Sequence, residues 1–416
     1  MRVDRTPHPD DIWDLAVVGA GPAGSAAALA ALRRRPGARV LIVDRAAFGR
    51  DKPCGDGIAP HALDVLTDLD LPDLAADHRP VHRLHLGYPG GVGVTGVMSR
   101  PAYVIPRATF DARILAGALA AGATFERRTV RRVEPRPDRV ILDGDVAARV
   151  VVAADGAESA VRRGLGLARN GQGHLAVAIR GYAPVRPDLA DEQRIAFGRG
   201  DWPAYAWSFP IGDGRANVGY GEVLRAGRPL TRAHLLGRLE ELLPGYAEHA
   251  TGWRAHHLPL SSQRPRQPAG RVLLAGDALS LINPMTGEGI FYAVLSGACA
   301  GSVAAGSAGS GSAAWAEAGS AAAWVGSGAA VSDPGRAYRV HLRRRLGRHL
   351  RHTTLTAALA RAPRLVDAGL ASAAGNAATF DTLVNLGLGQ GLLTPGILAG
   401  TARQLLSPGG GGPSAR

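Results

Sequence analysis

The sequence predicts an α/β fold in which a domain with a parallel sheet is interleaved with a domain with an antiparallel sheet and followed by a helical region. Residues 15–43 have the pattern of a strand, a glycine turn, an alanine-rich helix and a second strand, which begins a parallel sheet. Short alternating segments such as 176–181 and 205–209 are typical of an antiparallel sheet. The apolar run at 272–275 then returns to the style of the first domain.

Length and composition agree with this division. The 416 residues are enough for two cores, and a hydrophobic content of 46 % is typical of a globular protein. The changes of pattern along the chain give the domain bounds. We assign 1–80, 101–165 and 265–300 to the parallel-sheet domain, 81–100 and 166–264 to the antiparallel-sheet domain, 301–406 to a C-terminal helical region and 407–416 to a disordered tail.

Charge and cysteine content exclude several classes of protein. The net charge of +13 comes almost entirely from arginines spread along the chain, so we expect no nucleic-acid partner. Two cysteines, Cys54 and Cys299, are too few for a disulfide scaffold and have no metal-ligand spacing, so we expect no metal and a cytoplasmic protein. The apolar run at 15–18 is too short for a signal peptide, and no uninterrupted apolar stretch approaches the roughly 20 residues of a membrane span.

The C-terminal part has two unusual segments. Residues 296–330 are almost all Ala, Gly and Ser, with Trp315 and Trp324 as large side chains, and glycine disfavours helix there. Cys299 in this segment is expected to be a buried packing residue. Residues 336–352 predict a basic amphipathic helix with leucines at 342, 346 and 350. We prefer a surface helix packed by this leucine stripe, with peripheral membrane association as the alternative.

The first glycine motif, Val18-Gly19-Ala20-Gly21-Pro22-Ala23-Gly24, lies between a strand and a helix. Glycines there permit a tight turn and close approach of backbone amides to a pyrophosphate at the helix N-terminus. Asp44 follows 20 residues after Gly24, at the end of the second strand, where an acid can bind a ribose diol. The motif therefore predicts a Rossmann-like dinucleotide-binding domain, and Arg45 is included in its site.

A second motif favours FAD as the dinucleotide. Gly276-Asp277 follows the strand at 272–275, and its carboxylate suits a ribityl hydroxyl, which a nicotinamide nucleotide lacks. In the following segment 283–290, small residues and a helix start could present backbone amides to the flavin ring. Pro284, Gly287, Gly289 and Ile290 are the expected contacts.

These motifs, together with Asp155-Gly156, resemble the FAD-dependent group that includes aromatic hydroxylases. Two more, Lys52-Pro53-Cys54-Gly55-Asp56-Gly57 and the segment 203–210, resemble its geranylgeranyl reductase branch, which includes menaquinone reductases. The resemblance covers about residues 12–295. Hydroxylases of the group commonly have Ala-His after the Gly-Asp pair, whereas this chain has Ala278-Leu279, and its Gly-Glu-Gly-Ile at 287–290 is closer to the reductases.

The resemblance implies further site residues. It places the Cys54 loop beside the flavin ring, with Cys54 taking part in the reductive cycle and Arg107 binding FAD. Lys52, the only lysine of the chain, and Gly55 belong to the same loop. In a strand, Tyr205, Trp207 and Phe209 project to one face and form a wall about 13 Å long, suited to an apolar chain. Tyr205 and Trp207 are also expected at the catalytic centre.

The resulting hypothesis is an FAD-dependent enzyme that saturates carbon–carbon double bonds of an isoprenoid or similarly long apolar substrate. Hydride would come from reduced flavin, and a proton from the Cys54 thiol or an ordered water. The alternative is an FAD-dependent monooxygenase of a hydrophobic specialised metabolite, since the same scaffold hosts that chemistry. No second glycine motif is present, so NAD(P)H docking transiently or a reduced iron–sulfur protein would supply electrons.

Overall fold

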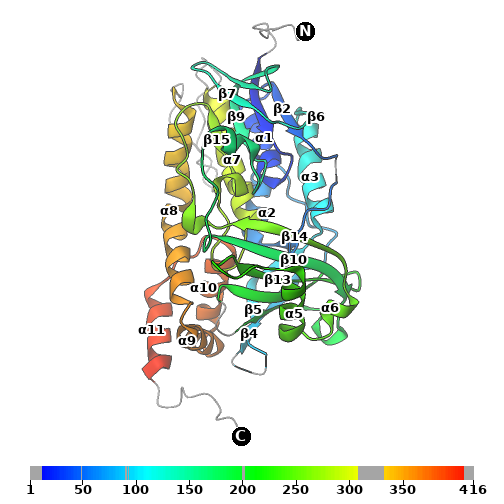
Figure 1. The fold of residues 1–416 in the computed structure, drawn as a ribbon, viewed down its shortest axis with the longest axis vertical. Coiled ribbons are helices and arrows are strands. Elements are labelled where there is room, and N and C mark those ends of the chain that lie inside the picture. The colour runs from blue at the N-terminus through cyan, green and yellow to red at the C-terminus, as the bar shows by residue number, and fades with distance from the viewer. Residues whose placement is uncertain are drawn as a thin grey trace.

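A computed structural model describes residues 12–47, 49–89, 91, 93–198, 202–307 and 332–406. In this part of the chain the strands form two sheets, and the last four helices of the chain continue along one side of the molecule (Figure 1). The predicted α/β fold with an interleaved antiparallel sheet and a C-terminal helical region is confirmed. The expected tail at 407–416, Trp315 and Trp324 lie outside the described residues.

The first sheet is parallel at its centre. Its described strands are β1 (Trp13–Val18), β2 (Val40–Asp44), β6 (Thr124–Arg127), β7 (Val133–Pro135), β8 (Val140–Leu142), β9 (Val146–Ala153) and β15 (Val272–Leu274). The order is β6-β2-β1-β9, with β15 parallel to the end of β9 and the β8-β7 pair antiparallel beside its start. β1, β2 and β9 are runs of apolar residues because helices cover this sheet.

The helices of the first domain are α1 (Pro22–Arg34), α2 (Pro60–Thr67), α3 (Arg107–Ala120), α4 (Ala160–Gly164) and α7 (Ile290–Ser307). Of these, α1 and α7 are rich in small residues and pack on the central strands of the first sheet. A Cβ atom on Gly297 would lie 2.0 Å from the Ala23 carbonyl oxygen, and one on Gly301 would lie 1.9 Å from that of Ala27. These glycines therefore allow α7 to pack directly on the backbone of α1. The weak helix signal after residue 296 was misleading, because tertiary packing outweighs the low helix propensity of glycine as far as Ser307.

Helix α7 is long and apolar enough to cross a membrane, and it is the one such helix among the described residues. Of its apolar window, however, 83 % is buried inside the protein. Cys299 on this helix is fully buried, as expected. The burial of α7 between α1 and the rest of the first domain identifies it as a core helix.

The second sheet combines two stretches of the chain. Its described strands are β3 (Gly57–Ile58), β4 (Val81–Gly87), β5 (Gly93–Val104), β10 (Leu175–Pro184), β11 (Glu192–Phe197), β12 (Ala204–Pro210), β13 (Arg215–Val223) and β14 (Thr251–Pro259). The order is β14-β10-β13-β12-β11-β4-β5-β3. All these pairs are antiparallel except β11 with β4, where the two stretches of chain meet. Helices α5 (Arg232–Leu242) and α6 (Tyr246–His249) pack on β10.

The C-terminal helices connect the two sheets. They are α8 (Pro334–Leu359), α9 (Pro363–Ala374), α10 (Ala377–Leu388) and α11 (Pro395–Leu406). α8 packs on α7, with its leucines at 342, 346 and 350 buried, so the predicted leucine stripe is confirmed. α9 and α10 pack on β5, where the Phe380 ring lies so close to Gly96 that a Cβ there would be 2.5 Å from it. The helical region thus closes one side of the space between the sheets.

Candidate active site

One cavity of about 1090 Å³ runs between the two sheets and the C-terminal helices. This is at the upper end of ligand-site volumes, which are roughly 300–1,000 Å³. Every residue predicted from the sequence to bind cofactor or substrate lines it, except Gly24 and Gly276. A Cβ on Gly24 would lie 1.8 Å from the Gly19 carbonyl oxygen, and Gly276, at φ +57°, packs against Ala23 and Ala293. These two glycines therefore lie behind the cavity wall and let the glycine turn and α7 approach each other.

The nucleotide end of the cavity is built by the start of α1 and the end of β2. A Cβ on Gly21, the residue before α1, would meet nothing within 4 Å, so this backbone faces open space at a helix N-terminus. The Asp44 carboxylate is held by the amides of Ala20 and Ala46, both at 2.8 Å. Arg45 lines the cavity beside it. This arrangement fits a pyrophosphate and a ribose diol.

Asp155 follows β9, on the other side of β1 from Asp44, and stabilises the turn into α4. Its carboxylate accepts hydrogen bonds from Ser159 Oγ at 2.5 Å and from the amides of Ala160 and Val161 at 2.7 and 3.2 Å, at the start of α4. Gly156 follows at φ +82° with open space where a side chain would be. Asp155 thus shapes the turn that leaves room at Gly156.

Farther along the cavity, Lys52 and Asp277 form an ion pair. Lys52 Nζ lies 3.1 Å from Asp277 Oδ2. Burial alone would raise the pKa of Asp277, but Lys52 and the neighbouring His256 hold it below its usual value, so this carboxylate is ionised at neutral pH. Nε2 of His256 is buried at the cavity without a hydrogen-bond partner among the described residues. These groups can bind polar atoms of a cofactor.

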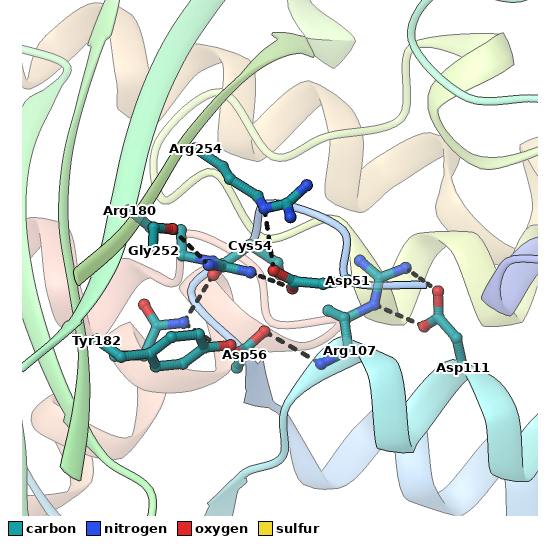
Figure 2. A network of polar contacts seen from close by, with 10 residues as sticks. Asp51, Cys54, Asp56, Arg107, Asp111, Arg180, Tyr182, Gly252 and Arg254 are labelled. Carbon is teal, nitrogen blue, oxygen red and sulfur yellow. Dashed lines mark hydrogen bonds and ion pairs between the residues drawn. The ribbon is translucent and has the colours of Figure 1, made fainter. Parts of the chain in front are cut away.

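The Cys54 loop is tied to both domains by polar contacts (Figure 2). Asp51, just before it, is paired with Arg180 of β10 and lies 3.2 Å from Arg254 of β14. Asp56, just after it, is fully buried and accepts hydrogen bonds from the Tyr182 hydroxyl at 2.6 Å and from the Asn217 amide at 2.7 Å. The loop is therefore fixed on both sides of the cysteine.

Arg107 at the start of α3 completes the network around Cys54 (Figure 2). Its buried guanidinium makes a bidentate pair with Asp111, at 2.6 and 2.7 Å, and its amide donates to Asp56 at 3.3 Å. Burial raises the pKa of the Cys54 thiol, and the charge of Arg107 offsets this only in part. The thiol is therefore protonated at neutral pH and is a weak acid.

The aromatic residues of β12 form a continuous row. Ring centroids of Tyr205 and Trp207 are 6.1 Å apart, and those of Trp207 and Phe209 are 6.5 Å apart. The Tyr205 hydroxyl donates to the Thr286 carbonyl, whereas Trp207 and Phe209 lie against Gly55. The row thus spans from the loop before α7 to the Cys54 loop, and its three rings line the cavity.

Two residues of β13 that the sequence did not reveal hold the row in place. Asn217 accepts a hydrogen bond from Trp207 Nε1 at 2.8 Å and donates to the Cys54 carbonyl at 2.8 Å. Gly219, paired with Trp207 across the strands, leaves room for the indole, because a Cβ there would lie 2.3 Å from it. Since the donor groups of Trp207 and Tyr205 are both used within the protein, these side chains are suited to shaping the cavity and orienting a substrate.

Glu288 is an acid that sequence reasoning missed. It lines the cavity between Gly287 and Gly289, and its carboxylate accepts a hydrogen bond from the Phe291 amide at 2.8 Å. Burial raises its pKa to about 7, so it exchanges protons near neutral pH. Glu288 follows Thr286, whose carbonyl accepts the hydrogen bond from the Tyr205 hydroxyl, so it lies near the Tyr205 end of the aromatic row. The sequence signal that could have revealed Glu288 is its position between two glycines expected at the cofactor.

Beyond the aromatic row the cavity becomes aliphatic. Its wall here comes from α8 to α11 and includes Leu359, Leu370, Leu383, Leu388 and Ile397. The sequence did not predict this contribution, because these residues are distant in the chain and each helix has an ordinary amphipathic pattern. One cavity therefore has a nucleotide end, a reactive middle and an apolar end.

This fold and site define an FAD-dependent oxidoreductase. The fit for FAD rests on the open glycine turn before α1, the fixed Asp44 carboxylate, and the Lys52–Asp277 pair with the unpartnered His256 nitrogen along one continuous cavity. A family model described as an FAD binding domain matches residues 13–191. Among the described residues, no group of three or more His, Cys, Asp or Glu side chains could hold a metal ion.

Proteins with a similar sequence show to which family of FAD-dependent oxidoreductases the chain belongs. Menaquinone reductase of Mycobacterium tuberculosis is 34 % identical, over 70 % of this chain and 76 % of its own. Digeranylgeranylglycerophospholipid reductase 1 of Methanopyrus kandleri is 35 % identical, over 70 % of this chain and 80 % of its own. The chain therefore belongs to the geranylgeranyl reductase family of FAD-dependent oxidoreductases. A geranylgeranyl bacteriochlorophyll reductase-like protein from Thermoplasma acidophilum shares the fold, with a TM-score of 0.74 at 21 % identity over 94 % of this chain and 96 % of its own.

Proposed function

We propose that this protein saturates carbon–carbon double bonds of an isoprenoid or a similarly long apolar substrate. The observation that carries the proposal is the single cavity, in which the nucleotide end, the Cys54 loop with the aromatic row, and the aliphatic end follow one another. An extended hydrocarbon can lie along the helices while one of its double bonds reaches the middle. The names of the 34–35 % identical relatives support the same chemistry.

Reduced FAD supplies a hydride equivalent when it is bound. The protein's own part is to hold the alkene and to exclude water. Tyr205, Trp207 and Phe209 give a rigid apolar surface, fixed to the two cavity loops, against which a flat alkene can lie. Such positioning removes orientational freedom before the reaction, and the apolar wall removes competing water.

The second alkene carbon requires a proton, and Glu288 is our candidate for its donor. With a pKa of about 7, this carboxyl group is partly protonated at neutral pH and can regain a proton after it has donated one, which suits a general acid. Cys54 is less suitable, because burial raises the pKa of its thiol above an already high value. We assign Cys54 to shaping the reactive middle of the cavity, where Asn217 fixes its backbone.

For electron supply we propose a transient reductant, either NAD(P)H or a reduced iron–sulfur protein. The sequence has one glycine motif for binding a dinucleotide, and this motif, at the start of α1 with Asp44, is assigned to FAD. A nicotinamide nucleotide would therefore have no binding motif of its own. Stopped-flow reduction of the oxidised holoenzyme distinguishes the two. Rapid bleaching by NADH or NADPH alone selects the nucleotide, whereas bleaching only with a reduced ferredoxin selects the protein donor.

The function is tested by anaerobic incubation of the reduced holoenzyme with a panel of prenyl substrates, followed by mass spectrometry. We expect flavin reoxidation and a product heavier by two hydrogens for each saturated bond. The fully saturated form of each substrate is the matched control and should leave the flavin reduced. Absence of both reoxidation and mass gain would falsify the proposal. Turnover that requires oxygen and adds one oxygen atom would instead establish the monooxygenase alternative.

A further inference from the structure

Large apolar side chains are exposed at the end of α8 and on α11. Among the described residues, seven large hydrophobic side chains are exposed, and five of them belong to these two segments, at 39 to 83 % exposure. They are Leu355, Leu359, Leu398, Leu405 and Leu406. Spacings of four and seven residues place the leucines of each helix on one face. Single exposed leucines are ordinary, whereas a group of five marks an interaction surface.

The same helices wall the apolar end of the cavity. Leu359, Leu398 and Leu405 line it and are also exposed to solvent, so the cavity opens between α8 and α11. The inward side of the last two turns of α8 has small residues, Thr353 and Ala357, where its earlier turns have leucines. The large side chains of this end of α8 therefore point outward, around the opening.

Positive charge is concentrated in the same part of the chain. Residues 334–406 contain ten arginines and two aspartates, so they contribute +8 to the net charge of +13. Arg351 precedes Leu355 by one turn, Arg361 follows Leu359 in the link to α9, and Arg364 is in the first turn of α9; all three are exposed. Exposed leucines with arginines beside them are typical of surfaces that lie in the interface of an anionic bilayer.

We propose that these five leucines, with Arg351, Arg361 and Arg364, form a docking face for an anionic lipid bilayer, so that a lipid substrate passes from the membrane into the cavity between α8 and α11. The inference rests on the proposed function for its substrate, but the docking face itself does not depend on turnover. A bilayer is the favoured occupant because the apolar group surrounds the opening of an apolar cavity and its charged neighbours complement acidic headgroups.

Vesicle flotation of the FAD-loaded enzyme tests the docking face without substrate. The probes are vesicles of phosphatidylcholine alone and vesicles that also contain phosphatidylglycerol. We expect binding to the anionic vesicles, a loss on the order of 100-fold for the double variant Leu355→Asp/Leu406→Asp, and a loss of roughly 25-fold for Arg361→Gln/Arg364→Gln, at about fivefold per arginine. Neither Leu355 nor Leu406 lines the cavity.

Val340→Asp is the matched control. Val340 is on the same helix with comparable exposure, but 15 residues from Leu355, which is about 22 Å along the axis. This variant should bind anionic vesicles as the natural protein does. Equal binding to neutral vesicles, no binding at all, or unchanged binding by both double variants would overturn the proposal. So would a dimer that dissociates in the leucine variant, because a second copy would then be the occupant.

A kinetic measurement separates this inference from the proposed function. We expect the leucine variant to reduce a detergent-dispersed prenyl substrate at the natural rate and to fail with the same substrate embedded in anionic vesicles. If neither enzyme reduces any substrate, the proposed function fails while flotation still decides the docking face. If both use vesicle-embedded substrate equally, the docking face is overturned and the function stands.

Discussion

Replacing Glu288 by Gln tests the assignment of the proton donor. The amide keeps the size of the side chain and still accepts the hydrogen bond from the Phe291 amide, so helix α7 is not disturbed. It has no acidic proton to donate. Since general acid catalysis by a positioned side chain contributes about 10² to 10⁴ in rate, the variant should reduce substrate slower by that factor.

The pH dependence gives the prediction a second readout. Burial raises the pKa of Glu288 to about 7, so the natural enzyme should lose activity roughly tenfold per pH unit above that value. The Glu288→Gln variant should show no such fall. Single-turnover reoxidation of the reduced flavin, followed by stopped-flow absorbance under anaerobic conditions from acid to alkaline pH, measures both rates.

The stability of the natural protein must also fall as the pH rises. The folded protein raises the pKa of Glu288 above its usual value, so the stability linked to this group is complete at acid pH and is lost as the pH rises through about 7. A shift of this size corresponds to about 3 kcal/mol, and less where water reaches the group. Glu288→Gln should therefore unfold at a higher temperature than the natural protein at pH 8.

A buried glutamate outside the cavity is the control. Glu192 of β11 is ion-paired with Arg194 at 2.7 Å and does not line the cavity. Glu192→Gln should keep the rate and its pH profile, and should not gain stability at alkaline pH. The assignment of Glu288 is wrong if Glu288→Gln retains the natural rate with the natural alkaline fall.

Three further variants test the geometry of the site. Gly219→Ala should cost about 1 to 3 kcal/mol of unfolding free energy and shift tryptophan fluorescence, because the new Cβ would lie 2.3 Å from the Trp207 ring. Lys52→Met should destabilise the protein by about 3 kcal/mol at pH 7 and weaken FAD binding measured by equilibrium dialysis, because it leaves the largely buried Asp277 carboxylate charged and without its cation. Native Cys54 should react with iodoacetamide more slowly at pH 7 than a free thiol does, with the rate rising at alkaline pH, because burial raises its pKa.

Each of these three predictions has a control. Gly237→Ala on the exposed face of α5 meets nothing within 4 Å and should stabilise the protein by up to about 1 kcal/mol. The double variant Lys52→Met/Asp277→Asn removes both charges and should recover part of the lost stability. Unfolded protein should alkylate rapidly at both cysteines. An unchanged melting temperature for Gly219→Ala, or equal alkylation of folded and unfolded protein, would contradict the described packing.

The fold could be predicted from the sequence where a local pattern sets the structure. The strand, glycine turn and helix around Gly21 form one continuous motif, and the alternation of Tyr205, Trp207 and Phe209 sets which rings share a face. Such patterns depend only on near neighbours in the chain. Helix α7 beyond residue 296 could not be predicted in this way, because its glycines are favourable only where the backbone of α1 packs against them.

The site was predictable to the same extent. Cys54 and the aromatic row were expected at one place, and the cavity brings them together. Asn217 and Gly219 act through single contacts across strands, and nothing around them in the sequence indicates which ring they face. The pKa of Glu288 likewise depends on burial, which arises only when the loop before α7 closes on the second sheet. Long-range packing, unlike periodicity, leaves little trace in a single sequence.

The division of the cavity wall between distant parts of the chain has a consequence for enzyme engineering. The redox end is built by residues before 294, whereas the aliphatic end takes its side chains mainly from α8 to α11. Larger or smaller side chains at helix positions such as Leu383 or Leu388 should therefore shorten or lengthen the hydrocarbon chain that the cavity accepts. Grafting these helices from a relative should transfer its choice of chain length while the flavin keeps its own surroundings.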